Sequence, residues 1–165
     1  AKKSRKKTRA KQAPALSAKL WAAWLKYVME KAGPRMYFVV FLTGAFCLRM
    51  GEALALKRQD LQLDGEEPFV NVSGATAGAQ KSPGKVYISA KNLKTIKAAI
   101  AKGITCKREV NSRHGVKMRK EIYNIPPRGF LFRARANASQ KHRSYQAAYH
   151  SISALAPNFL SLIHV

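Results

Sequence analysis

Acidic residues are scarce in this chain: its 165 residues include 8 Asp and Glu against 31 Lys and Arg, which gives a formal net charge of +23. The acids are also unevenly placed, because five of the 8 fall between Glu52 and Glu67 and none follows Glu121. A protein this basic repels itself unless a polyanion neutralises it. The charge balance therefore favours nucleic acid as the partner, with an anionic membrane surface as the weaker alternative.

Cysteines and long apolar runs are also scarce. The two cysteines, Cys47 and Cys106, are too few for a disulfide framework and lack metal-ligand spacing. We interpret Cys47 as buried and Cys106 as a surface thiol. Residues 37–50 form the longest apolar stretch, which is too short for a membrane span, and no signal peptide is visible. We therefore expect an intracellular protein with no metal, no small-molecule cofactor and no membrane partner; the basic N-terminal run predicts the nucleus in a eukaryote, and otherwise the cytoplasm or nucleoid.

The apolar content of 47% is high enough for a globular fold. We expect residues 1–13 to form a basic, flexible tail and residues 14–165 to form one domain. Capping and periodicity predict, in chain order, helices at residues 17–33, 34–48 and 52–57, a β-hairpin at 67–88, a helix at 89–103, a short strand at 129–132 and a last helix at 140–155. Residues 104–128 are basic and poorly periodic, so we interpret them as a loop or insertion. The expected fold class is mixed α/β, mainly α-helical, with a small β-hairpin or sheet.

Residues 48–61 are the most informative stretch for function. Arg49 and Glu52 lie three positions apart, a spacing that places both on one face of a helix. An arginine that follows an apolar stretch is expensive to desolvate unless it meets a carboxylate or a phosphate. Two interpretations are therefore open, a structural Arg–Glu pair at a helix end and a guanidinium that binds phosphate.

Residues 47–60 resemble the first conserved box of the tyrosine recombinase (phage integrase) family, G-L-R-x-x-E-x-x-x-L-x-W-x-D. The arginine, glutamate, leucine and aspartate of the box correspond to Arg49, Glu52, Leu56 and Asp60 without a gap. Cys47 stands where the family has glycine, and the residue at position 58 is arginine where the family has tryptophan. The resemblance continues in the order of elements: a hairpin with a lysine at its tip, a helix, and an L-F segment at residues 130–132.

This resemblance implies a helical catalytic domain that cleaves and rejoins DNA through a 3′-phosphotyrosyl link, without a cofactor. Arg49 would then clamp the attacked phosphate and Lys81, at the hairpin tip, would protonate the leaving oxygen. Glu52 and Asp60 would support the site, and His164 stands about where the histidine of the family's H-x-x-R box would fall. Duplex DNA would be the partner, with self-association on the DNA left open. The lysines and arginines expected to contact DNA are Lys2, Lys3, Arg5, Lys6, Lys7, Arg9, Lys85, Lys91 and Lys94.

The chain departs from the family after the last predicted helix. No arginine lies three residues after a histidine, and Tyr145 and Tyr149 precede the position where the nucleophile is expected. Their spacing with Ile152 predicts a stripe that faces the core. We therefore expect a truncated catalytic domain that does not cleave DNA alone. The alternatives are a catalytically inactive DNA-binding module of the same fold and a generic basic RNA-binding protein.

Overall fold

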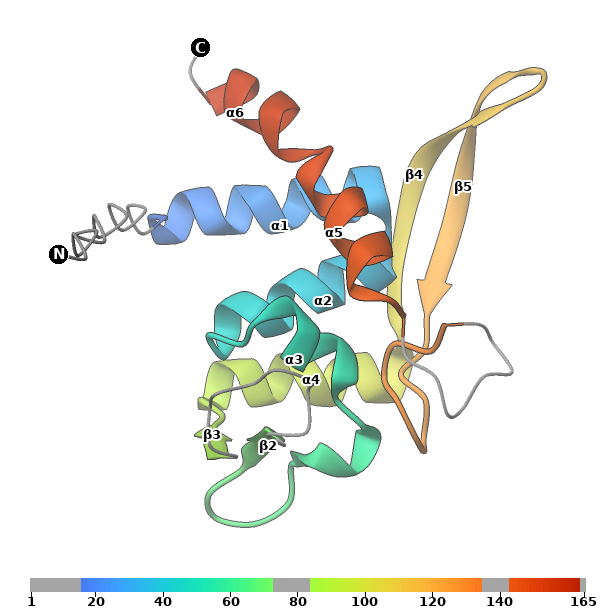
Figure 1. Cartoon of the computed structure of the whole chain (residues 1–165). Coiled ribbons are helices and arrows are strands. Elements are labelled where there is room, and N and C mark those ends of the chain that lie inside the picture. Colours follow the sequence, from blue (N-terminus) through green and yellow to red (C-terminus); the bar gives the residue numbers. More distant parts are fainter. Residues whose placement is uncertain (1–15, 73–83, 135–142, 164–165) are drawn as a thin grey trace, which may run out of the picture.

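The computed structural model describes residues 16–72, 84–134 and 143–163. The fold is mixed α/β, with more residues in helices than in strands and with two small antiparallel sheets (Figure 1). The described elements are α1 (Ala18–Ala32), α2 (Pro34–Ala45), α3 (Met50–Ala55), a 3₁₀ turn (Arg58–Asp60), β1 (Leu61–Gln62), β2 (Phe69–Val72), β3 (Gly84–Tyr87), α4 (Ala90–Lys102), β4 (Ile104–Ser112), β5 (Gly115–Tyr123), α5 (Tyr145–Ser153) and α6 (Ala156–Ile163).

Helices α1 and α2 form a tight antiparallel pair. The Ser17 hydroxyl accepts the backbone N–H of Leu20 at 3.2 Å, as predicted for a cap. Gly33 ends α1 with a φ of 89°, a conformation that side chains disfavour, and Pro34 then begins α2. The helices approach so closely that a Cβ on Gly44 would lie 2.0 Å from the Trp21 ring. The start of both helices is therefore confirmed, although α2 ends at Ala45 rather than near Leu48.

The core is built around α2. Phe38 and Leu42 are fully buried, as expected for a helix that is apolar on nearly all sides. The centre of the Phe38 ring lies 5.9 Å from that of Phe132 and 6.1 Å from that of Tyr123, so aromatic side chains from distant parts of the chain meet at one point. Helix α4 adds Ile96, also fully buried, from a segment that Ser89 caps and Gly103 ends.

The predicted β-hairpin is confirmed in its two strands. Strands β2 and β3 pair antiparallel from Phe69 opposite Tyr87 to Val72 opposite Gly84, and β1 extends the sheet in the order β1-β2-β3. Val70 is fully buried at the centre of this sheet. The tip, which includes Lys81, lies outside the described residues.

The prediction of a loop at residues 104–128 was wrong. Strands β4 and β5 pair over nine residues each, from Ile104 opposite Tyr123 to Ser112 opposite Gly115, where a φ of 104° makes the turn. Apolar residues alternate with polar ones in both strands, at Ile104, Cys106 and Val110 in β4 and at Val116, Met118 and Ile122 in β5. Arg108 and Lys120 each stand at a position where the alternation calls for an apolar residue, so the segment was interpreted as a basic loop. The two strands are defined by the hydrogen bonds between their backbones, and the residue pattern of one strand does not predict which other strand it pairs with.

Three other expectations differ from the structure. Residues 129–132 form no regular strand; instead, a single bridge joins Phe130 to Lys57. The helix predicted at residues 140–155 is α5, which begins at Tyr145, and α6 after it was not predicted. Cys47 is exposed rather than buried, and it lies in the turn after α2 with a φ of 52°. The chain reverses there, in the left-handed conformation that glycine adopts most easily.

Candidate nucleic-acid interface

Arg49 lies at the start of α3, just after this reversal. The Leu48 side chain before it is buried, so the turn is fixed to the core. Arg49 itself has extended backbone angles, as a residue that precedes a helix usually does, and its side chain is exposed. The buried leucine and the left-handed turn therefore fix the Arg49 backbone at the surface.

Glu52 supports Arg49 through the backbone. Its side chain is buried, with 8% of its surface exposed, and its Oε2 accepts the backbone N–H of Arg49 at 2.7 Å. This contact satisfies a donor that the helix leaves unpaired at its first turn. No carboxylate in the described part of the chain forms an ion pair with the Arg49 guanidinium. The structural ion pair is therefore not formed, and the charge of Arg49 is uncompensated by Glu52.

Asp60 repeats the same arrangement in the 3₁₀ turn that follows α3. Its Oδ2 accepts the backbone N–H of Lys57 at 2.8 Å, at the start of the 3₁₀ turn. The Lys57 ammonium lies 5.2 Å from the centre of the Phe130 ring. Each acid of the box is thus the third residue of a helical turn, and its carboxylate accepts the backbone N–H of the residue that precedes this turn. This contact explains the three-residue spacing from Arg49 to Glu52 and from Lys57 to Asp60.

Tyr145 and Tyr149 do not face the core, contrary to the sequence prediction. Their side chains are 52% and 50% exposed, and their rings stack at 5.8 Å on the outside of α5. The fully buried residue of α5 is Ala148, and α5 packs against α3. A small residue at the contact lets the helices approach, while the two tyrosines project beside it.

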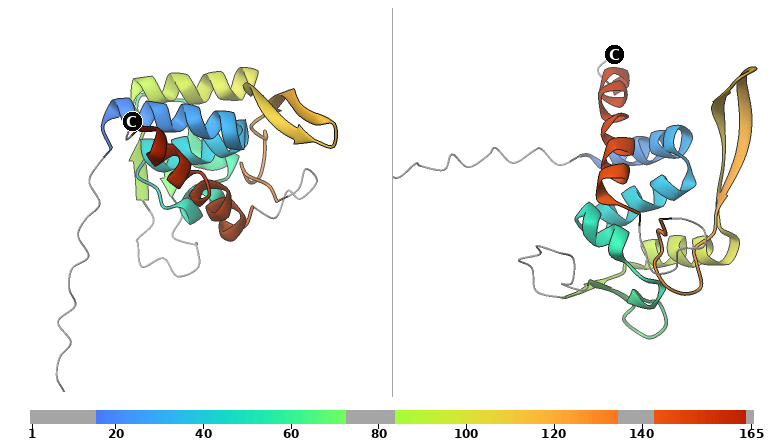
Figure 2. Two further views of the ribbon diagram at one scale, coloured as in Figure 1. Left: turned by 90° about the horizontal axis from the view of Figure 1, so that it is seen from above. Right: turned by 45° about the vertical axis from the view of Figure 1, so that its right-hand side comes forward.

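The β4–β5 hairpin projects from the body of the protein (Figures 1 and 2). We call residues 107–120 of this hairpin the basic arm. Every residue from 111 to 120 is exposed, and Glu109 is the single acid of the basic arm. Lys107 lies opposite Lys120, and Arg108 lies opposite Arg119. Like charges directly across a ladder are destabilising. Arg108 is compensated by an ion pair with Glu121, so Lys107 and Lys120 form the cross-strand pair whose repulsion an anion would relieve.

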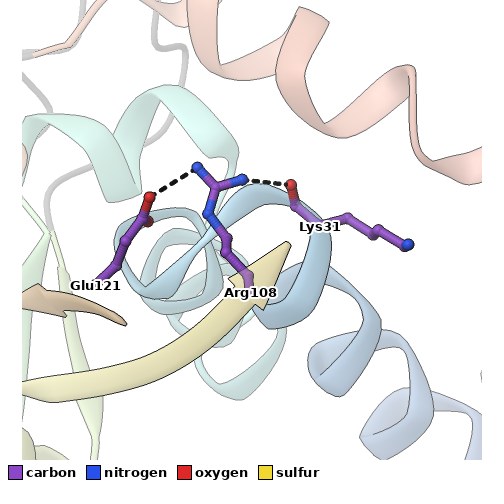
Figure 3. Close-up of polar contacts among 3 residues, drawn as sticks. All are labelled: Lys31, Arg108 and Glu121. Carbon is purple, nitrogen blue, oxygen red and sulfur yellow. Dashed lines mark hydrogen bonds and ion pairs between the residues drawn. The ribbon is translucent and has the colours of Figure 1, made fainter. Parts of the chain in front are cut away.

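Arg108 anchors the base of the basic arm to α1. Its guanidinium donates to the backbone oxygen of Lys31 at 3.0 Å and forms an ion pair with Glu121 at 2.9 Å (Figure 3). A Cβ on Gly33 would lie 2.6 Å from Glu121 Oε2, so the glycine leaves room for this contact. The base is therefore held by specific contacts, while the outer part is exposed.

The sequence-predicted DNA contacts are only partly described by the structure. Lys85, Lys91 and Lys94 are exposed, and the Lys85 ammonium lies 4.4 Å from the centre of the Phe69 ring. His164, Lys81 and the N-terminal candidates (Lys2, Lys3, Arg5, Lys6, Lys7 and Arg9) lie outside the described residues. The basic arm was not among the predicted DNA contacts, although three of the four residues at positions 117–120 are basic.

No family model, curated protein or solved structure matches this chain. Across residues 16–72, 84–134 and 143–163, no three metal-binding side chains gather into a group that could hold an ion. None of the helices within the same ranges has both the length and the hydrophobicity to cross a membrane.

Proposed function

We propose that this chain is a duplex-DNA-binding domain whose Arg49 region resembles the first half of a tyrosine recombinase active site. The observation that carries DNA binding is the basic arm, where like charges oppose each other on an exposed two-stranded ribbon. A two-stranded ribbon fits the major groove of B-DNA, whereas the major groove of A-form RNA is too deep and narrow for it. Duplex DNA is therefore the preferred polyanion.

Arg49 supports the recombinase resemblance on chemical grounds. A phosphodiester under attack gains negative charge on its non-bridging oxygens, and a guanidinium fork matches that geometry. The Arg49 side chain is exposed and its guanidinium forms no ion pair with Glu52, because the Glu52 carboxylate accepts the backbone N–H of Arg49. In this proposal Arg49 clamps a DNA phosphate and Lys81 is the proton donor. The alternative function is DNA binding by the same fold with no chemistry.

We expect affinity for duplex DNA to fall steeply with salt. If about six phosphates are neutralised, a plot of the logarithm of the binding constant against that of the salt concentration should have a slope of about −5. Fluorescence anisotropy with a labelled duplex measures it, and a folded RNA of equal charge is the matched competitor. A slope near zero, or tighter binding to the RNA, contradicts the proposal.

We also expect the 165-residue polypeptide to form no covalent adduct with DNA. Its sequence contains no H-x-x-R box, and the effects of groups that act together on one phosphate are strongly non-additive. The test is a suicide duplex, nicked beside the labelled strand, followed by denaturing electrophoresis. Because Tyr145 and Tyr149 are exposed beside each other, Tyr145→Phe and Tyr149→Phe are the variants to compare. An adduct that either substitution removes would assign the nucleophile to α5 and refute the expectation.

A further inference from the structure

A second basic site, which does not include Arg49, lies where three segments of the chain meet. Arg35, in the first turn of α2, donates a hydrogen bond to the backbone oxygen of Arg133, 98 residues further along the chain. Arg133 in turn donates to the backbone oxygen of Arg128 at 2.7 Å. The two arginines line a partly open cavity of about 320 Å³, whose remaining walls are Tyr123, Asn124, Ile125, Pro126, Pro127 and Leu131.

The charges of Arg35 and Arg133 are uncompensated. All eight acidic side chains lie in the described part of the chain, and none of them forms an ion pair with either arginine. The only acceptors of these two guanidiniums there are neutral backbone oxygens, and their Nε atoms are buried with no hydrogen-bond partner. Buried charged donors are normally paired, so these guanidiniums favour an anion as the ligand of the cavity.

The neighbouring groups strengthen this imbalance. Burial, followed by the positive charge of Arg143, lowers the pKa of Arg35. Burial raises the pKa of Tyr123, so its phenol stays protonated and donates to the Leu131 backbone oxygen at 2.6 Å. Tyr123 is therefore a neutral wall of the cavity and supplies no negative charge. Pro126 and Pro127 also line the cavity, and their rings restrict the backbone there, which favours a cavity of fixed shape.

We propose that this cavity binds a phosphoryl group. Two guanidiniums present forked donors that match a phosphate, and a phosphate of charge near −2 would neutralise both of them. A carboxylate carries one charge and fewer acceptor oxygens, so it fits the site less well. The phosphoryl group could belong to nucleic acid or to a small phosphate, and the two sources share this chemistry.

The first test needs no DNA, so it stands apart from the proposed function. Inorganic phosphate is titrated at constant ionic strength, with chloride as the reference salt, while thermal unfolding is monitored. Phosphate at about ten times its dissociation constant is expected to raise the Tm by roughly 3–6 °C. The variants Arg35→Gln and Arg133→Gln should lose this rise. Arg128→Gln removes an exposed charge outside the cavity lining and should keep it, so it is the matched control.

Binding is also measured by ³¹P NMR at low temperature, which separates loss of the site from loss of the fold. Circular dichroism first establishes that each variant is folded under those conditions. Arg133→Lys keeps the charge without the fork, and we expect it to bind phosphate more weakly than the natural chain but more tightly than Arg133→Gln. A folded Arg133→Gln variant that binds phosphate as the natural chain does would overturn the proposal. An equal response of the natural chain to phosphate and chloride would do the same.

Measurements of duplex-DNA binding by the same variants show whether the phosphoryl group belongs to DNA or to a small phosphate. If the cavity binds the DNA backbone, Arg133→Gln should lower the magnitude of the salt slope by about 0.9, the value for one phosphate contact. If it binds a small phosphate, the same variant should bind DNA as tightly as Arg128→Gln does. Failure of DNA binding by every form, with the phosphate response intact, would refute the proposed function and leave the phosphate site standing.

Discussion

Replacement of Lys117, Arg119 and Lys120 together by glutamine is expected to lower affinity for duplex DNA by roughly ten- to a hundredfold near physiological salt. All three side chains are exposed on the basic arm, and two of them lie opposite another cation. The salt slope should lose about 0.9 for each phosphate contact that disappears. Fluorescence anisotropy over a salt series provides both numbers.

A matched control variant removes the same number of charges elsewhere. Lys19, Lys97 and Lys102 are exposed on α1 and α4, so their joint replacement by glutamine changes the net charge equally. Residues 1–12 stay in place in both variants. Equal losses of affinity in the two variants would show that net charge, rather than the basic arm, determines binding. The arm variant is expected to be no less stable than the natural chain, because the repulsive cross-strand pair of Lys107 and Lys120 disappears.

The second large effect concerns stability, which Glu52→Ala is expected to lower by about 1–3 kcal/mol. The substitution leaves the partly buried backbone N–H of Arg49 without its acceptor. Glu52→Gln keeps an acceptor oxygen and should cost less than Glu52→Ala. Urea unfolding monitored by circular dichroism measures the difference, provided that the dependence of free energy on urea is the same in each variant.

Arg49→Ala is the matched comparison for the two substitutions of Glu52. The Arg49 side chain is exposed and forms no ion pair with Glu52, so its removal should change stability by no more than about 0.5 kcal/mol. It should also weaken DNA binding only slightly, because one contact among many is lost. A loss of stability as large as that of Glu52→Ala would restore the structural interpretation of the Arg–Glu spacing.

Features set by a few neighbouring residues were predictable from the sequence. Ser17 and Ser89 cap their helices, and Gly33 and Gly103 end them, because each signal acts within one helical turn. The pairing of β2 with β3 was likewise visible as two alternating segments. The fold class of mixed α/β follows from these local elements.

Features that depend on contacts between distant residues were not predictable in this way. The four-residue spacing of Tyr145 and Tyr149 shows that they share a face of a helix, but their environment depends on Ala148 and on the packing of α3. The alternation in β4 and β5 is interrupted by Arg108 and Lys120, and it does not show that the two strands pair with each other. The meeting of Arg35 and Arg133 joins residues 98 positions apart, which no local pattern reports.

The β4–β5 hairpin is also a sheet of two strands, so each strand has one edge with no strand beside it in the described structure. Val116, Met118 and Ile122 are exposed along β5, and such an edge could pair with a second copy of the chain and begin aggregation. The lysines and arginines between these apolar residues oppose that contact by electrostatic repulsion. The same charges therefore oppose pairing of the free edges, and a polyanion that neutralises them would remove this protection unless it also covers the strands.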